Sequence, residues 1–187
     1  MKTGLNLEFA HAVVMVCDLE RMIGFYTDVL GFEVTDRGPL NLGGNETEIV
    51  FLSQTATHHH QIAFAGGRGE IGRSNSVDHL AFRASGTLDD LRALKARLET
   101  DSDVKAIRPI THGNAWSVYF RDPEGNGVEV FIDTPWHVKQ PQGRPLDLAK
   151  ADDEITAWTQ ETFKDEGGFG PIDEFYERRS EHLASLA

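Results

Sequence analysis

The chain lacks the features that would place it outside a reducing, aqueous compartment. Cys17 is its only cysteine, which excludes an intrachain disulfide and a zinc site built from cysteines. The longest apolar run, residues 12–17, has about six residues, whereas a membrane helix needs about 20. No apolar segment precedes Glu8, so we expect no secretory signal. We therefore expect a cytoplasmic globular protein, whose 187 residues suffice for a substantial core.

Basic residues are also scarce. The 18 Lys and Arg are outnumbered by 30 Asp and Glu, which gives a net charge of −12 with neutral histidine. This excess argues against nucleic acid and anionic membranes as partners, because both need a basic surface. Small sheet modules have exposed edges that associate readily, so we expect a homo-oligomer, a dimer or larger.

The acidic residues are concentrated at the C-terminal end, where residues 147–187 carry 11 Asp and Glu against four Lys and Arg. We therefore divide the chain into a core domain, residues 1–134, and an acidic extension, residues 135–187. The extension is expected to be helical over Asp152–Phe163 and Ile172–Leu186. Helical spacing predicts an apolar stripe on the first of these helices: Ile155, Trp158 and Thr162. The extension has two alternative roles, a lid over the core domain and a surface for oligomer contacts.

Within residues 1–134, a β-α-β-β-β pattern occurs twice. The first module covers about residues 8–66 and the second about 76–134, with His11 corresponding to His79 at an offset of 68. The expected helices are 18–30 and 88–98, and the expected strands are 10–17, 32–36, 48–53, 59–64, 77–83, 104–110, 117–121 and 127–132. We predict an α+β fold in which the two βαβββ modules form one curved sheet around a cleft, followed by the C-terminal helical extension.

Two histidines and one carboxylate stand out by their positions. His11 and His79 open the first strand of each module, and Glu129 is an acid inside an otherwise apolar last strand. A buried carboxylate needs a partner or a cation. Two histidines and a carboxylate leave other metal positions open, as in non-haem Fe(II) sites that use oxygen. Each residue also has a structural alternative, since Glu129 can pair with an arginine such as Arg83.

The run of three histidines at positions 58–60 precedes the last strand of the first module. Its alternative interpretation is a polar loop, or adventitious metal binding. The offset of 50 from His79 to Glu129 maps the acid onto Gln61 in the first module. That module therefore lacks the fourth ligand that a four-ligand metal isomerase would need. His60, beside this position, is a candidate to accept and return a proton.

His112 and Tyr119 lie seven residues apart, ahead of an expected hairpin turn over Asp122–Gly127. A buried tyrosine hydroxyl seeks a hydrogen-bond partner, and near a metal-bound oxygen it can donate to that oxygen. For His112, a place in a surface loop is an equal alternative.

Taken together, these features resemble the vicinal oxygen chelate superfamily. The resemblance rests on His11, on the strand Val77–Phe82 and on the segment His112–Glu129. The turn and final Glu of that segment are shared with glyoxalases and antibiotic-resistance proteins. His60 and Tyr119 together narrow the resemblance to type I extradiol ring-cleaving dioxygenases, of the catechol 2,3-dioxygenase and biphenyl-2,3-diol 1,2-dioxygenase kind.

This resemblance implies extradiol, or meta, cleavage of a catechol-type aromatic diol by dioxygen. It implies Fe(II), with Mn(II) as the alternative, held in the cleft by three ligands: His11, His79 and Glu129. His60 would be the acid–base residue, and Tyr119 and His112 would contact the substrate or oxygen intermediates.

The resemblance covers about residues 8–150, with two departures. Many members carry an additional pair of modules, and the loop between His112 and Tyr119 is shorter here than in the biphenyl-diol enzymes. The same fold supports two rival functions. A metal-dependent lyase or isomerase of the glyoxalase type is opposed by the missing acid at position 61. A non-enzymatic protein that binds a drug would not need the three ligands together.

Overall fold

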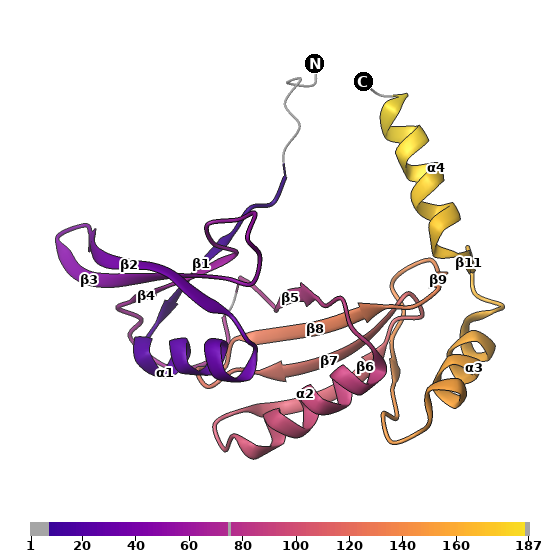
Figure 1. The fold of residues 1–187 in the computed structure, drawn as a ribbon, viewed down its shortest axis with the longest axis horizontal. Helices are drawn as coiled ribbons and strands as arrows, with labels where there is room; N and C mark the ends of the chain where they lie inside the picture. The colour runs from indigo at the N-terminus through magenta and orange to yellow at the C-terminus, as the bar shows by residue number, and fades with distance from the viewer. Residues whose placement is uncertain (1–7, 75, 186–187) are drawn as a thin grey trace. The chain divides into compact units, whose positions relative to one another are not determined.

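The computed structural model describes residues 8–74 and 76–185, which form two compact units (Figure 1). Unit 1 consists of Met1–Asp78, Asp101–Lys105 and Arg121–Asn126. Unit 2 consists of His79–Thr100, Ala106–Phe120 and Gly127–Ala187. Each of the two larger sheets contains the strands of one βαβββ repeat, and helices follow the second repeat. The α+β class and the two predicted modules are therefore confirmed, whereas a single curved sheet made from both stays a prediction.

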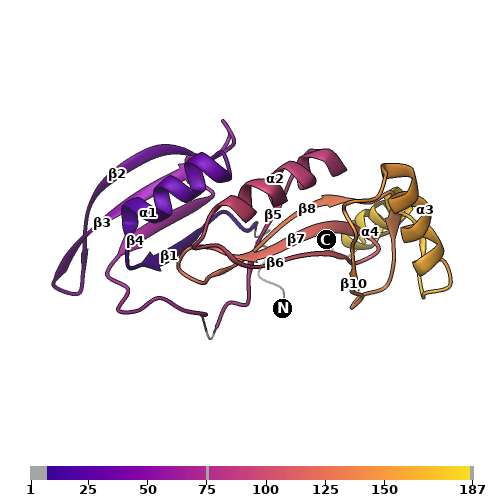
Figure 2. The same cartoon turned by 90° about the horizontal axis from the view of Figure 1, so that it is seen from below.

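Unit 1 is built on a four-stranded sheet in the order β1-β4-β3-β2. Its strands are β1 (Ala12–Val16), β2 (Glu33–Leu42), β3 (Asn45–Ser53) and β4 (Ile62–Gly66). Helix α1 (Leu19–Gly24) continues as a π-helical turn, η1 (Phe25–Val29), and lies on one face of the sheet (Figure 2). Asp18 caps the start of α1 by accepting a hydrogen bond from the Arg21 amide, as a helix N-cap does.

Strands β2 and β3 extend well beyond the segments 32–36 and 48–53 that the sequence predicts. They form one long hairpin whose turn, Gly43 and Gly44, has positive φ at both residues. Strand β2 is mostly exposed and shows no regular hydrophobic alternation, whereas β3 buries Val50 and Leu52 in the core. Backbone pairing and an exposed Arg37–Glu48 ion pair join the two strands.

Unit 2 contains a five-stranded sheet in the order β10-β6-β7-β8-β5, with helix α2 (Leu88–Thr100) on one face. The strands are β5 (Leu80–Arg83), β6 (Lys105–Thr111), β7 (Ala115–Arg121), β8 (Gly127–Asp133) and β10 (Arg144–Pro145). The edge strand β10 comes from the acidic extension, so the extension completes this sheet rather than forming a separate body.

The rest of the extension also belongs to unit 2. It contains helices α3 (Asp152–Phe163) and α4 (Ile172–Ala184). Between them lies the short strand β11 (Gly170–Pro171), which pairs with β9 (Trp136–His137). Both predicted helices are confirmed, with Leu186 of the second outside the described residues. The predicted stripe on α3 is wrong beyond Ile155: the buried residues are Ile155, Thr159 and Phe163. In the described chain, no helix has the length and apolar character to cross a membrane.

The extension packs closely against Gly113, in the turn between β6 and β7. Its φ is +82°, and an added Cβ would lie 2.5 Å from Val138 Cγ1 and 3.1 Å from the Phe163 ring. We expect Gly113→Ala to lower the free energy of unfolding by about 2 kcal/mol, because strain and clash add. Urea unfolding measures this. Gly143→Ala, with open space around it, is the control; equal effects of the two changes would contradict the prediction.

Candidate metal centre

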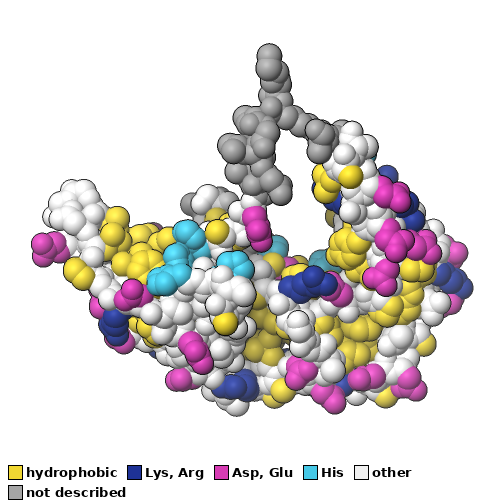
Figure 3. Space-filling view, turned by 45° about the horizontal axis from the view of Figure 1, so that its top comes forward, with side chains coloured by type: hydrophobic (Ala, Val, Ile, Leu, Met, Phe, Trp, Pro, Cys, Tyr) yellow, Lys and Arg dark blue, Asp and Glu magenta, His cyan; other side chains and the backbone are white. Residues whose placement is uncertain are grey.

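The face of the unit 1 sheet opposite α1 carries apolar side chains next to histidine. On β1, Val13 and Met15 are 51% and 37% exposed, while Val16 on the alternate face is buried. By the same alternation, His11 lies on the exposed face with Val13 and Met15. Figure 3 shows histidine side chains gathered beside hydrophobic ones. This face therefore combines exposed apolar side chains with histidine.

His60 lies against His11 within unit 1. The centroids of the two rings are 4.2 Å apart, and the Phe51 ring packs edge-on against His60 at 4.8 Å. His59 Nδ1 is 2.9 Å from His60 Nδ1. Burial, then the neighbouring His11 and His59, lower the pKa of His60 below the ordinary imidazole value. His60 is therefore neutral at neutral pH and able to accept a proton.

Glu129 is held in unit 2 by two polar partners. It lies on β8 opposite Ala81 of β5, in register with the strand that follows His79. Glu129 is 7% exposed; its Oε2 lies 3.1 Å from His79 Nε2, and its Oε1 accepts a 2.7 Å hydrogen bond from Ser117 Oγ. The alternative that Arg83 pairs with Glu129 is wrong, because Arg83 pairs with Asp133.

Tyr119 and His112 lie beside this pair. His112 Nε2 is 2.9 Å from the Tyr119 hydroxyl and 3.8 Å from Glu129 Oε1. The Tyr119 ring packs edge-on against His79, with centroids 5.2 Å apart. His112 is half-buried in the turn between β6 and β7, and its role in the site stays a prediction.

The structure thus brings four of the six predicted site residues together in unit 2: His79, His112, Tyr119 and Glu129. The other two, His11 and His60, adjoin one another in unit 1. Across residues 8–74 and 76–185, no three His, Cys, Asp or Glu side chains are already arranged to share one metal ion. The three-ligand set therefore stays a prediction, of which the structure shows the His79–Glu129 contact.

Strand register corrects the predicted equivalent of Glu129 in the first module. Val13 of β1 pairs with Ala63 of β4, whereas Ala81 of β5 pairs with Glu129 of β8. The equivalent of Glu129 is therefore Ala63 and not Gln61, because the connections within the two modules differ in length. Unit 1 still offers no carboxylate at this position.

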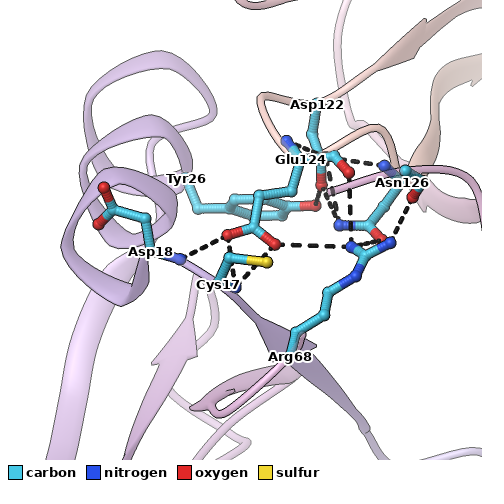
Figure 4. Close-up of polar contacts among 8 residues, drawn as sticks. Cys17, Asp18, Tyr26, Arg68, Asp122, Glu124 and Asn126 are labelled. Atoms are coloured by element: carbon cyan, nitrogen blue, oxygen red, sulfur yellow. Dashed lines mark hydrogen bonds and ion pairs between the residues drawn. The ribbon is translucent and has the colours of Figure 1, made fainter. Parts of the chain in front are cut away.

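Sequence reasoning assigned the segment Asp122–Gly127 only to a turn and missed Glu124. Its carboxylate accepts hydrogen bonds from the amides of Cys17 and Asp18, at 2.7–2.9 Å, and lies 3.5 Å from Arg68 Nη1 (Figure 4). Glu124 is 1% exposed. In a sequence, an acidic residue between Pro and Gly is normally interpreted as a solvent-exposed turn residue. The one indication of another role was that a Pro-Gly turn forms without an acidic residue.

Comparison with known proteins identifies the family of this chain. Residues 8–130 match the Glyoxalase/Bleomycin resistance protein/Dioxygenase superfamily, and the chain belongs to this superfamily. Biphenyl-2,3-diol 1,2-dioxygenase 3 of Rhodococcus globerulus is 35% identical over 66% of this chain and 62% of its own length. For 3-methylcatechol 2,3-dioxygenase of Pseudomonas putida the values are 26%, 64% and 40%. The predicted resemblance is confirmed, although the match spans less than two thirds of these relatives' length.

Solved structures give the same fold. A glyoxylase/bleomycin resistance protein/dioxygenase domain from Frankia has a TM-score of 0.57 and 20% identity, covering 70% of this chain and 94% of its own. The fosfomycin resistance protein FosX of Listeria monocytogenes, in complex with Mn(II), has a TM-score of 0.50 and 18% identity, covering 72% and 95%. At these identities the likeness shows the fold alone.

Proposed function

We propose that the chain is an extradiol dioxygenase that opens a catechol-type aromatic ring next to its two hydroxyl groups, with both atoms of dioxygen entering the product. The observation that carries this proposal is the cluster of His79, Glu129, Tyr119 and His112 within unit 2. The similarity to diol dioxygenases supports the same chemistry.

The donor atoms fit a divalent metal. His79 Nε2 and Glu129 Oε2 face each other at 3.1 Å, and Ser117 fixes the other carboxylate oxygen, as outer partners of metal ligands do. The sequence pattern adds His11 as the third ligand, and these three residues would make a nitrogen and oxygen set suited to Fe(II), with Mn(II) as the alternative. When bound, such an ion would make diol hydroxyls more acidic and would supply the redox chemistry for dioxygen.

The remaining residues handle the substrate and its protons. His60, neutral beside His11, accepts the proton of a diol hydroxyl and returns it when the ring opens. Tyr119, paired with His112, would contact a substrate oxygen. The apolar face formed by Val13 and Met15 packs on the aromatic ring and keeps water from it.

The direct test is metal analysis after anaerobic purification, together with oxygen uptake on addition of catechol or 2,3-dihydroxybiphenyl. We expect iron, and consumption of one dioxygen for each diol cleaved. Nickel, zinc or cobalt with turnover of a thiol adduct and no oxygen uptake would instead show a glyoxalase-type enzyme. Tight ligand binding without metal would show a drug-binding protein.

Replacing His60 by Ala or Phe should leave metal content unchanged and slow turnover by about 10²-fold, because general acid–base catalysis contributes about that much. Steady-state oxygen uptake measures the change. His58→Ala is the matched control, since His58 is exposed and contacts only Thr57 among the hydrogen bonds described. Turnover in the His60 variants equal to that of His58→Ala would reject the role of His60.

A further inference from the structure

His112 is held at both nitrogens of its ring. Nδ1 lies 2.6 Å from the main-chain oxygen of Gln142, which belongs to the C-terminal extension. Nε2 lies 2.9 Å from the hydroxyl of Tyr119 on β7. The extension therefore reaches the candidate site directly, through a carbonyl group.

These distances determine which nitrogen carries the proton in the neutral ring. A carbonyl oxygen only accepts hydrogen bonds, so a nitrogen 2.6 Å from it has to be the N–H. The neutral ring then has a lone pair on Nε2, which accepts the hydroxyl proton of Tyr119. Glu129 Oε1 does not compete for Nε2, because it lies 3.8 Å away and already accepts the Ser117 hydroxyl.

We infer that residues 138–142 of the extension are a positioning segment for the site, in which the Gln142 carbonyl fixes the tautomer of His112 and thereby turns the Tyr119 proton toward His112. Tyr119 then presents an oxygen lone pair, and not its proton, to a substrate hydroxyl. This replaces the sequence-based expectation that Tyr119 donates. The effect on catalysis rests on the proposed function, whereas the tautomer of His112 rests only on its contact with the Gln142 carbonyl.

The segment is tied to His112 by a second connection. Gln140 Nε2 donates to the His112 main-chain oxygen at 2.8 Å and to Asn114 Oδ1 at 3.1 Å. Gln140 Oε1 accepts the amide of Gln142 at 2.9 Å. One side chain therefore sets the distance between the His112 backbone and the carbonyl that holds its ring.

The test is the 15N spectrum of the histidine rings in the full chain, treated with a chelator and recorded at about pH 8.5, where imidazole is ordinarily neutral. The His112 signals are identified by their loss in His112→Gln. We expect a protonated Nδ1 and an unprotonated Nε2. A protonated Nε2, or two tautomers in comparable amounts, would overturn the inference whether or not the protein cleaves diols. The expected tautomer without diol cleavage would reject only the proposed function.

Variants separate positioning from folding. In Gln140→Ala we expect a mixture of His112 tautomers and a loss of kcat of about 10-fold with unchanged metal content, the lower limit typical of outer-shell changes. Gln142→Ala is the matched control for the spectrum, because it removes the side chain and keeps the carbonyl, and its tautomer should match the unchanged chain. A single Nδ1–H form in Gln140→Ala would overturn the role of Gln140, and a mixed form in Gln142→Ala would overturn that of the carbonyl.

Discussion

Glu129→Ala should abolish metal binding and lower diol turnover by about 10³-fold or more, since changes in outer-shell partners alone cost 10- to 100-fold. The carboxylate is the one anionic ligand in the assigned set, and Ala leaves only imidazole nitrogens. The same change should not unfold the protein. It leaves the buried Ser117 hydroxyl without its acceptor, so we expect the free energy of unfolding to fall by about 1–3 kcal/mol, which is less than the whole stability of a typical domain.

Metal analysis and oxygen uptake measure the first effect, and thermal unfolding of the metal-free chain measures the second. Glu181→Ala, on the exposed helix α4, is the control for the general loss of a carboxylate. Glu129→Gln keeps the shape and removes the charge, so it should bind metal almost as poorly as the Ala variant. Iron bound at wild-type stoichiometry in both Glu129 variants would contradict the ligand assignment.

Repeated patterns made much of the fold predictable. The strands around His11 and His79 alternate clearly, and α3 begins and ends at the predicted residues. The pattern failed where stability does not come from hydrophobic burial. Strand β2 and the tip of its hairpin with β3 are mostly exposed, and backbone pairing joins them there. On α3, Thr159 is buried because its hydroxyl accepts the Trp116 indole N–H at 2.9 Å, a contact with a distant strand.

The residues of the candidate site could be predicted where they follow the internal repeat or the family resemblance. His79 and Glu129 meet because β5 and β8 pair in parallel, and that pairing follows from the βαβββ order. The equivalent of Glu129 in the first module could not be obtained by counting, since the register depends on connection lengths. The partners of His112 lie 30 residues away in the extension, where no periodic pattern indicates a contact.

The largest expected loss of stability comes from Glu124. Its carboxylate accepts the amides of Cys17 and Asp18 at the start of α1 and faces the Arg68 guanidinium (Figure 4). The same turn is braced by Asp122, which accepts hydrogen bonds from the Asn126 amide and side chain. Glu124→Ala leaves the part-buried amides of Cys17 and Asp18 without their acceptor and takes the carboxylate partner from Arg68. We expect the free energy of unfolding to fall by about 4 kcal/mol.

Glu124→Gln distinguishes the charge from the hydrogen bonds. The Gln side chain keeps one oxygen that can accept from the main-chain amides of Cys17 and Asp18. Its NH2 group faces the Arg68 guanidinium, which is also a donor, so we expect the free energy of unfolding to fall by about 2 kcal/mol. Glu99→Ala is the matched control, because its exposed pair with Lys95 contributes only about 0.5 kcal/mol. Urea unfolding of the three variants gives the order Ala, Gln, then control. If Glu124→Ala were as mild as Glu99→Ala, the start of α1 would not depend on this turn, and Glu124 would be an ordinary turn residue.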